Sequence, residues 1–418
     1  MYSYPFCDIV YYINGGYMKK IGKIILALVL TAGVGFTGYV VGLNRDSNAT
    51  NKSEDQAHIE DMHMLKSLID KNFLFDYKEE DLYEGSLKGM FANLGDPYTQ
   101  YYSKNEFSKL METLDGRYKG IGVLVQASKE GFIKVVQVFD GSPASEAGLK
   151  EGDYIIKVEG KEYSADQMEE AVAIMKGEED TNVKITVRRM KEDGKNFEDI
   201  DMDVARRDVK VDTIDESLLG IRDKKIGYIH IKSFDDVTGE DFEDSYKKLK
   251  EAGMEGLVLD LRNNPGGSLD VCLDIADKFL DKGVIVTTED KNGEVITEES
   301  DEEKDDIPMT VLVNENSASA SEILSGALKD RDRAKIIGKN TFGKGIVQKL
   351  FPLEYGSGAK ITISEYHTPS GAKINKVGVE PDIEVENSEE GLEISKDNLS
   401  KDDQFKKALQ VLLDQMGE

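Results

Sequence analysis

The first strongly patterned segment is a run of 19 uncharged, mostly apolar residues at positions 24–42. A helix of that length, at about 1.5 Å per residue, nearly spans the ~30 Å hydrocarbon core of a bilayer. Lys19, Lys20 and Lys23 lie on its N-terminal side, and by the positive-inside rule this end stays in the cytoplasm. We therefore predict an uncleaved signal anchor over residues 18–43, with the remainder outside the cell membrane; a cleaved signal peptide is the alternative.

The residues before this segment do not fit ahead of a signal anchor. Met18 is followed directly by two lysines, as expected at the start of such a segment. We expect residues 1–17 to be an extension that comes from a mis-assigned start site.

The pattern becomes helical after a polar linker at residues 44–57. Ile59, Met62, Leu65 and Leu68 recur at helical spacing. A second apolar-periodic stretch follows and ends at a Gly-Asp-Pro turn. We predict an N-terminal helical region over residues 58–112.

Short strands dominate residues 113–196. Runs rich in Val and Ile alternate with turns. Two short helices interrupt them: one is capped by Ser142, has Pro143 in its first turn and stops at Gly148, and the other covers the apolar-periodic stretch before Lys176. This predicts a compact β-module.

Strands and amphipathic helices alternate over residues 197–386, with a hairpin about Asn292 and Gly293. Such alternation predicts helices packed on a mostly parallel sheet. Residues 387–418 form an acidic tail that ends in an amphipathic helix. The fold class is therefore mixed α+β: an α/β core, an inserted β-module, an N-terminal helical region and one transmembrane anchor.

Composition narrows the function classes. The formal net charge of −28 argues against nucleic-acid binding, which needs clustered Lys and Arg. Cys7 and Cys272 lie on opposite sides of the predicted anchor, so we expect no disulfide. The four histidines form no metal-binding motif, so we predict no metal and no cofactor.

The strongest chemical signal is a cluster of small hydroxyl residues followed by a lysine between glycines. Ser319 and Lys344 lie 25 residues apart, and Gln348 lies four residues further on. A lysine acts as a base only when neutral, and with a pKa near 10.4 roughly one in 2,500 is neutral at pH 7. Burial can lower that pKa by ~3 units. Since side chains alternate along a strand, Lys344 and Gln348 are expected on one face.

Each part of this signal has a plainer explanation. Ser317, Ser319 and Ser321 could all serve as helix caps, and a lone lysine is usually solvated. The stretch before Gly345 nearly matches a phosphate loop, but Gly345 replaces the required Ser or Thr and a strand-like run follows instead of a helix. We set the nucleotide site aside.

Backbone amides that could bind an oxyanion occur at two places. The Ala320 N–H at the start of a predicted helix is one. Gly266 and Gly267, in the Asn-Asn-Pro-Gly-Gly turn after a buried strand, are the other candidates.

The β-module carries a second motif. Its helix-and-turn sequence at residues 141–160 resembles a circularly permuted bacterial PDZ domain, and Gly120, Ile121, Gly122 and Val123 resemble the loop that binds a peptide's terminal carboxylate in that fold. The neighbouring strand would then take up the peptide by β-augmentation. A generic β-module with a glycine-rich hairpin is the alternative.

Taken in order, these motifs over residues 58–385 resemble the carboxyl-terminal processing proteases, a Ser/Lys family also called tail-specific proteases. The resemblance implies Ser319 as nucleophile, Lys344 as general base and Gln348 as its orienting partner. It implies an oxyanion hole from the Ala320 N–H and an amide of Gly266 or Gly267. Lys176 stands where the family often has an Arg that couples peptide binding to activation, so the regulation by the PDZ domain is an open question.

The resulting hypothesis is a membrane-anchored extracytoplasmic serine endopeptidase that captures apolar C-terminal tails of proteins and cleaves through an acyl-enzyme. A PDZ adaptor with an inactive protease domain is the alternative. A His-dependent protease lacks a convincing His–Asp pair, and His230 is expected to be a sheet residue. The first helices and the last one could form a homodimer interface, and a monomer that packs them internally is the alternative.

Overall fold

The computed structural model describes residues 54–388 and 394–417, and the chain divides into two compact units, Met1–Asp81 and Leu82–Glu418. Within the first unit, helix α2 (Glu54–Asn72) carries the predicted apolar spacing, and none of its side chains is buried. No helix in the described ranges is long and apolar enough to cross a membrane. The predicted anchor at 18–43 and the extension at 1–17 lie outside the described residues.

Helix α3 (Glu79–Ala92) runs into the second unit and is followed by β1 (Gln100–Tyr102) and α4 (Lys104–Asp115). Ser103 begins α4 because its backbone N–H is bound by Glu106 at 2.8 Å. Gly116 ends the helix in the left-handed conformation. Strand β1 pairs with β18 (Gly358–His367), so this segment joins the sheet that later carries part of the site.

The β-module is one antiparallel sheet in the order β3 (Val123–Ala127), β4 (Ile133–Val138), β5 (Tyr154–Val158), β7 (Asn182–Met190) and β8 (Phe197–Ala205), with β6 (Lys161–Glu162) beside β5. Helices α5 (Pro143–Glu146) and α6 (Met168–Met175) and the 3-10 turn η1 (Ala165–Gln167) accompany it. Ser142 caps α5 as predicted, accepting from the Ser145 N–H at 3.2 Å. Strand β8, beyond residue 196, completes this sheet.

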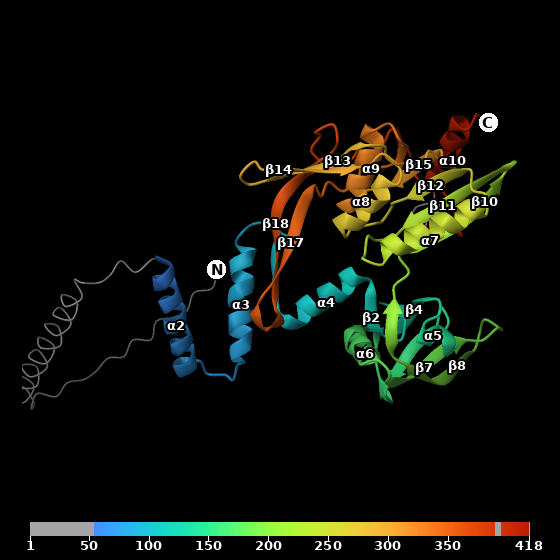
Figure 1. The fold of residues 1–418 in the computed structure, drawn as a ribbon. Coiled ribbons are helices and arrows are strands. Elements are labelled where there is room, and N and C mark those ends of the chain that lie inside the picture. Colours follow the sequence, from blue (N-terminus) through green and yellow to red (C-terminus); the bar gives the residue numbers. More distant parts are fainter. Residues whose placement is uncertain (1–53, 389–393, 418) are drawn as a thin grey trace, which may run out of the picture. The chain divides into compact units, whose positions relative to one another are not determined.

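Two short strands lead into and out of this module. β2 (Arg117–Gly120) enters it and β9 (Arg207–Lys210) leaves it, and the two pair antiparallel. The β-module is therefore inserted between α4 and the following sheet through this two-stranded connection (Figure 1).

The core sheet has the order β10 (Ile214–Ile221), β11 (Lys224–Ile231), β12 (Gly256–Asp260), β15 (Met309–Val313), β16 (Lys335–Gly338) and β19 (Ile383–Glu384). All neighbours from β11 onward are parallel, and β10 is an antiparallel edge. The alternation of strands and helices predicted this arrangement.

Helices cover both faces of the core sheet (Figure 1). Leu257 and Leu259 of β12 pack in one cluster with α7 (Thr238–Glu251), α8 (Leu269–Asp277) and α9 (Ala320–Asp330). Val258, between them, packs in another with α10 (Asp403–Gln415). Burial on both faces explains why these strands are continuous apolar runs.

A second sheet has the order β1, β18, β13 (Gly283–Asp290) and β14 (Val295–Ser300), with β17 (Ile346–Pro352) also paired to β18. The short 3-10 turn η2 (Glu354–Gly356) links β17 to β18. The predicted hairpin about Asn292 and Gly293 is confirmed as the β13–β14 turn. Strand β17 belongs to this antiparallel sheet and not to the parallel one.

A buried ion cluster ties the C-terminal helix to the end of β12. Arg262, with no exposed side-chain surface, contacts Asp260 at 2.5 Å and Asp402, the cap of α10, at 2.6 Å. Burial alone would raise the pKa of Asp260, but the Arg262 guanidinium holds that pKa below its ordinary value. The cluster therefore fixes the strand end from which the Asn-Asn-Pro-Gly-Gly turn departs.

Replacing Arg262 with methionine should lower the free energy of unfolding by about 3–5 kcal/mol, because two buried carboxylates lose their counter-ion. Urea unfolding followed by circular dichroism measures this. The control is Lys282→Met, which removes an exposed ion pair with Glu302 at 3.5 Å and should change stability by less than about 1 kcal/mol. Equal stability of the two variants would contradict the prediction.

Candidate active site

Ser319 lies in the connection between β15 and α9, immediately before the first turn of the helix. Its φ is 56° and its ψ −114°, a conformation that a non-glycine residue adopts at a cost of about 1–3 kcal/mol. Strain of this kind at a strand–turn–helix junction is the geometry that presents a nucleophile. The side chain is largely buried, with 8% of its surface exposed.

The two neighbouring serines, which the sequence could not separate from Ser319, have structural partners. The Ser317 hydroxyl donates to the Leu261 carbonyl at 2.7 Å, and the Ser321 hydroxyl donates to the Asn264 carbonyl at 3.0 Å. Both bonds join this connection to the turn after β12. Of the three serines in the cluster, Ser319 is the one whose hydroxyl does not donate to the turn after β12.

Glu322 is a site residue that the sequence analysis did not identify. It is fully buried, and its carboxylate accepts four hydrogen bonds. One oxygen accepts from the backbone N–H groups of Ser319 (2.9 Å) and Lys344 (2.8 Å). The other accepts from the Thr341 hydroxyl (2.5 Å) and the Gly343 N–H (2.6 Å). Its position three residues after Ser319 is the capping-box spacing, a sequence signal that could have revealed it.

Lys344 lies in the loop before β17, and its glycine neighbours allow a close backbone approach. A Cβ at Gly345 would lie 2.2 Å from the Asn375 nitrogen, and one at Gly343 would lie 3.1 Å from the Val377 nitrogen. The Lys376 N–H also donates to the Gly343 carbonyl at 2.7 Å. The glycines therefore let this loop pack against residues 374–378, which sets the backbone of Lys344.

The surroundings of Lys344 lower the pKa of its ammonium group. Burial is the main cause and the Lys360 cation adds to it, while the carboxylates of Glu322 and Asp96 oppose the shift. The ammonium also lies over the Tyr98 ring, 5.0 Å from its centre. A lowered pKa increases the neutral fraction, as a general base requires.

Ser319 and Lys344 are thus joined through their backbones by one carboxylate. Within residues 54–388 and 394–417, no hydrogen bond links the Ser319 hydroxyl directly to the Lys344 ammonium. Tyr98 and Asp96, which lie beside Lys344, come from the Gly-Asp-Pro turn, and Asp96 is held there by the Thr362 hydroxyl at 2.6 Å. The sequence pattern indicates this turn only as the end of a helical region.

Gln348 lies on β17, and its amide N–H donates to the Ile346 carbonyl at 3.2 Å. Strand alternation does not place Gln348 and Lys344 on one face, because Lys344 precedes β17 and the pairing register with β18 shifts between Val347 and Gln348. Such an irregularity breaks the alternation of side chains. In the described part of the chain Gln348 has no hydrogen bond to Lys344.

The turn after β12 lies against the nucleophile. A Cβ at Gly266 would lie 2.8 Å from the Ser319 Cβ and 3.0 Å from the Ala320 nitrogen. The Gly266 N–H is already bound by the Asn264 side chain at 2.8 Å. The Gly267 and Ala320 N–H groups have no acceptor among the described residues, so these two amides are available to a ligand.

Two further buried side chains surround Ser319. Burial raises the pKa of the Tyr366 phenol to about 12, and its interaction with the Ser319 side chain opposes that rise. The Cys272 thiol donates to the Ala320 carbonyl at 3.2 Å. His230 is a sheet residue, as predicted: it lies on β11, with its Nε2 3.0 Å from the Arg262 carbonyl oxygen.

The loop of the β-module that contains Gly120 to Val123 joins β2 to β3. Ile121 is buried, and Gly122 has a φ of 87° in close contact with Ser142. Lys176, which ends α6, forms an ion pair with Glu112 of α4 at 2.8 Å. The candidate regulatory lysine therefore contacts the segment before the module.

Comparisons with known proteins agree with this arrangement. The profile of peptidase family S41 matches residues 225–385, that of a PDZ domain matches residues 134–189, and that of the activating protease CtpB N-terminal domain matches residues 30–106. A crystal structure of an S41 protease from Bacteroides fragilis has the same fold, with a TM-score of 0.53 at 16% identity over 82% of this chain and 92% of that one.

Two relatives cover most of the chain. The "Carboxy-terminal processing protease CtpA" of Bacillus subtilis is 33% identical over 374 residues, 88% of this chain and 78% of the relative. A "Probable CtpA-like serine protease" of Staphylococcus aureus is 34% identical over 370 residues, 88% of this chain and 71% of the relative. This chain therefore belongs to peptidase family S41, as a C-terminal processing serine peptidase with a PDZ domain.

Proposed function

We propose that this chain is a membrane-anchored extracytoplasmic endopeptidase that cleaves protein tails with Ser319 as nucleophile and Lys344 as general base. The observation that carries the proposal is the Glu322 carboxylate, which holds the backbone N–H groups of both residues. The lowered pKa of Lys344 adds support, because a base must be neutral when it takes a proton.

In the proposed reaction, neutral Lys344 takes the proton of the Ser319 hydroxyl as its oxygen attacks the scissile carbonyl carbon. The Ala320 and Gly267 N–H groups bind the oxyanion of the tetrahedral intermediate. The Lys344 ammonium then gives its proton to the leaving amine, which leaves an acyl-enzyme. Lys344 next removes a proton from water as the water oxygen attacks the acyl carbon. The Lys344 ammonium then returns that proton to the Ser319 oxygen as the peptide acid leaves.

The mechanism requires Lys344 to leave the Tyr98 ring and turn toward Ser319. The side-chain N–H of Gln348 donates to the Ile346 carbonyl, so the side-chain oxygen of Gln348 can accept a hydrogen bond from Lys344. In this proposal Gln348 orients the base after that turn. The described arrangement is then the resting form of the site.

A serine-directed fluorophosphonate probe, followed by mass spectrometry of the labelled peptide, tests the mechanism. We expect labelling at Ser319 in the intact protein and none in Lys344→Ala at the same pH. Equal labelling of Ser319 in the Lys344→Ala variant would contradict the role of Lys344 as general base. Absence of any labelling would favour the adaptor alternative, in which the protease domain is inactive.

Substrates are proposed to be proteins with unstructured, apolar C-terminal tails. The support is the loop at Gly120 to Val123 beside the edge of β3, a strand with one partner only among residues 54–388 and 394–417. A comparison of protein C-termini between cells with the native chain and cells with Ser319→Ala tests this. The new C-termini that depend on Ser319 should belong to proteins whose precursors end in apolar tails.

The localisation rests on the uncharged segment at 24–42 with lysines before it. We propose that it anchors the protein while residues 44–418 remain outside the membrane. Carbonate extraction should leave the chain in the membrane fraction, and protease added to intact spheroplasts should degrade it. Release by carbonate would argue for the cleaved signal peptide.

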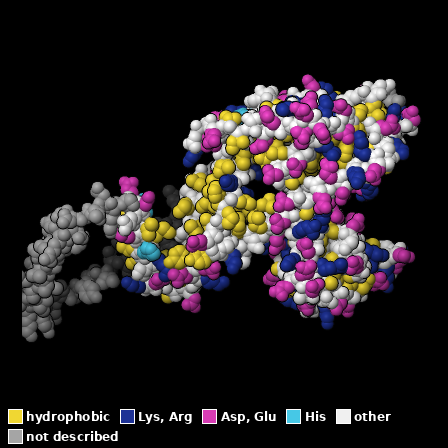
Figure 2. Space-filling view, in the orientation of Figure 1, with side chains coloured by type: hydrophobic (Ala, Val, Ile, Leu, Met, Phe, Trp, Pro, Cys, Tyr) yellow, Lys and Arg dark blue, Asp and Glu magenta, His cyan; other side chains and the backbone are white. Residues whose placement is uncertain are grey.

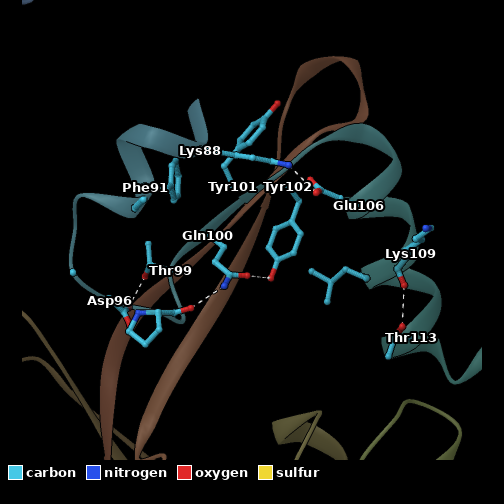
Figure 3. A pocket seen from close by; sticks show the side chains of 14 residues that line it. Lys88, Phe91, Asp96, Thr99, Gln100, Tyr101, Tyr102, Glu106, Lys109 and Thr113 are labelled. Atoms are coloured by element: carbon cyan, nitrogen blue, oxygen red, sulfur yellow. Dashed lines mark hydrogen bonds and ion pairs between the residues drawn. The ribbon is translucent and has the colours of Figure 1, made fainter. Parts of the chain in front are cut away.

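We also propose a homodimer through the N-terminal helices. Ile59, Met62, Leu65 and Leu68 of α2 are 48–57% exposed. Separately, α3, β1 and α4 line a pocket of about 900 Å³, shown in Figure 3, in which apolar side chains such as Phe91 lie beside charged ones such as Lys88 and Glu106. Figure 2 shows hydrophobic side chains exposed on α2 and around β17 and β18. Since α2 from a second copy has an apolar stripe, it is the occupant we propose for this pocket.

Replacing Leu65 and Leu68 with glutamate should convert the dimer to a monomer, because the apolar contacts of both leucines are lost and a carboxylate without a partner is buried only at a large cost. Analytical ultracentrifugation of the detergent-solubilised chain gives the mass. Lys71→Glu, a change of charge on the same helix, serves as the control and should leave the dimer intact. A monomeric native chain would contradict the proposal.

A further inference from the structure

The position that a peptide carboxylate would take in the PDZ loop is filled by a side chain of the protein itself. The Val123 N–H donates to the Tyr118 hydroxyl oxygen at 3.2 Å. The Gly122 N–H also interacts with this oxygen. The Val123 N–H of the loop Gly120 to Val123 is therefore directed at the phenol oxygen, as it would be at a carboxylate, and the Gly122 N–H contributes to holding the same oxygen.

Tyr118 reaches this position because it lies on β2, directly before the loop. A Cβ at Gly120 would lie 2.7 Å from the Tyr118 ring, so the ring packs against the backbone at the start of the loop. Phe139 packs edge-on against the ring, with centres 6.4 Å apart. The hydroxyl is thereby directed inward at the loop amides.

Lys176 lies over the same ring. Its ammonium is 5.0 Å from the centre of the Tyr118 ring and 2.8 Å from the Glu112 carboxylate. Its Cα would be 3.8 Å from a Cβ at Gly120, and the Gly177 N–H donates to the Lys119 carbonyl at 3.3 Å. A cation thus stands beside the carboxylate loop, held by the ring and by α4.

The strand that would bind the rest of the peptide has an unpaired edge in the described ranges. There, β3 is the edge of its sheet and pairs only with β4. Val123 and Val125 of β3, and Met168 and Val172 of α6, are only partly buried against the module core. A peptide could therefore add to β3, and the end of the groove that would bind its carboxylate is the part that is occupied.

We propose that Tyr118 is an internal competitor for the terminal carboxylate of the substrate, which displaces the phenol from the loop amides and then pairs with Lys176. The inference rests on the proposed function of the module in binding C-terminal tails. It makes Tyr118 and Lys176 the residues that set affinity for a free C-terminus, and it links that binding to Glu112 of α4.

The exchange is chemically favourable for an anionic ligand. Burial raises the pKa of Tyr118 to about 12, so its hydroxyl is neutral at physiological pH. Hydrogen bonds to a carboxylate are roughly twice as strong as those to a neutral oxygen. A peptide with an amidated C-terminus lacks this advantage and should not displace the phenol.

The test measures binding of an eight-residue peptide with an apolar last residue to the full chain carrying Ser319→Ala. The peptide is used as the free acid and as the C-terminal amide. Tyr118→Phe keeps the ring and removes the hydroxyl, so it should raise the affinity for the free acid about threefold to tenfold, the worth of one ordinary hydrogen bond. The affinity for the amide should stay unchanged.

Tyr154→Phe, a tyrosine of β5 in the same module, is the matched control and should bind like the parent. Adding Lys176→Met to Tyr118→Phe should reduce free-acid binding again. Equal free-acid affinity with and without the Tyr118 hydroxyl overturns the inference while the proposed function stands. Equal binding of acid and amide in every variant overturns the carboxylate-binding role of the module itself, and the inference with it.

Discussion

Ser319→Ala and Lys344→Ala should each lower kcat/KM for a peptide substrate by roughly 10⁴-fold or more, because each removes one half of a nucleophile–base pair that acts as a unit. Both variants should fold. Glu322 binds the backbone N–H groups of these residues and not their side chains, so its hydrogen bonds survive both substitutions. Hydrolysis of a labelled peptide and thermal melting measure the two effects.

Ser321→Ala is the control for the serine cluster. It removes a hydrogen bond from the Ser321 hydroxyl to the Asn264 carbonyl, so it should cost about 1 kcal/mol of stability and retain most of the activity. Native-like cleavage by Ser319→Ala would refute the assignment of the nucleophile. A double variant of Ser319 and Lys344 should be no less active than either single one, because the pair acts as a unit.

The role of Lys344 as general base predicts that kcat/KM depends on pH. Activity should rise with pH through the lowered pKa of Lys344, below its usual value of 10.5. Lys360 helps to lower that pKa, so Lys360→Met should move the acid limb of the kcat/KM profile to higher pH. Lys349→Met, another cation on the adjacent strand, should leave the limb where it is. An unmoved limb in both variants would exclude Lys360 as a cause.

The apolar runs of the core predicted the fold because burial on both faces leaves a clear sequence pattern. Leu257 to Leu259 alternate between two helical layers, and only a strand covered on both sides needs such a run. The same rule could not assign β17 to its sheet. A short apolar strand fits either sheet, and its partner β18 and its register shift at Gln348 depend on contacts that local sequence does not encode.

The residues missed at the site were missed for a related reason. Tyr98 acts on Lys344 from a turn that lies about 250 residues earlier in the chain, and Tyr118 accepts a hydrogen bond from the Val123 N–H of the loop that follows it. Aromatic residues are common in and beside turns, so the presence of a tyrosine there does not indicate a functional residue. Glu322 is different, because its capping-box spacing from Ser319 is visible in the sequence. Its hydrogen bonds to residues 341–344 are not.

Glu322→Gln should lower kcat/KM by about 100-fold or more, which is the effect of losing roughly 3 kcal/mol of site-organising hydrogen bonds. The carboxylate has one oxygen for Ser319 and Lys344 and one for Thr341 and Gly343. A glutamine must direct its NH₂ group at one of these pairs, and each pair includes a backbone N–H that cannot accept. At least one of the hydrogen bonds that join Glu322 of helix α9 to the loop of Lys344 is therefore lost.

A pH profile separates positioning of the dyad from a general loss of structure. The Glu322 carboxylate raises the pKa of Lys344, so its neutralisation should lower that pKa and move the acid limb of kcat/KM to lower pH. Glu315→Gln, an exposed glutamate in the same connection, is the matched control and should change neither rate nor profile. A reduced rate with an unmoved acid limb would mean that Glu322 supports the fold alone, since a purely structural defect changes the active fraction without changing the protonation of the base.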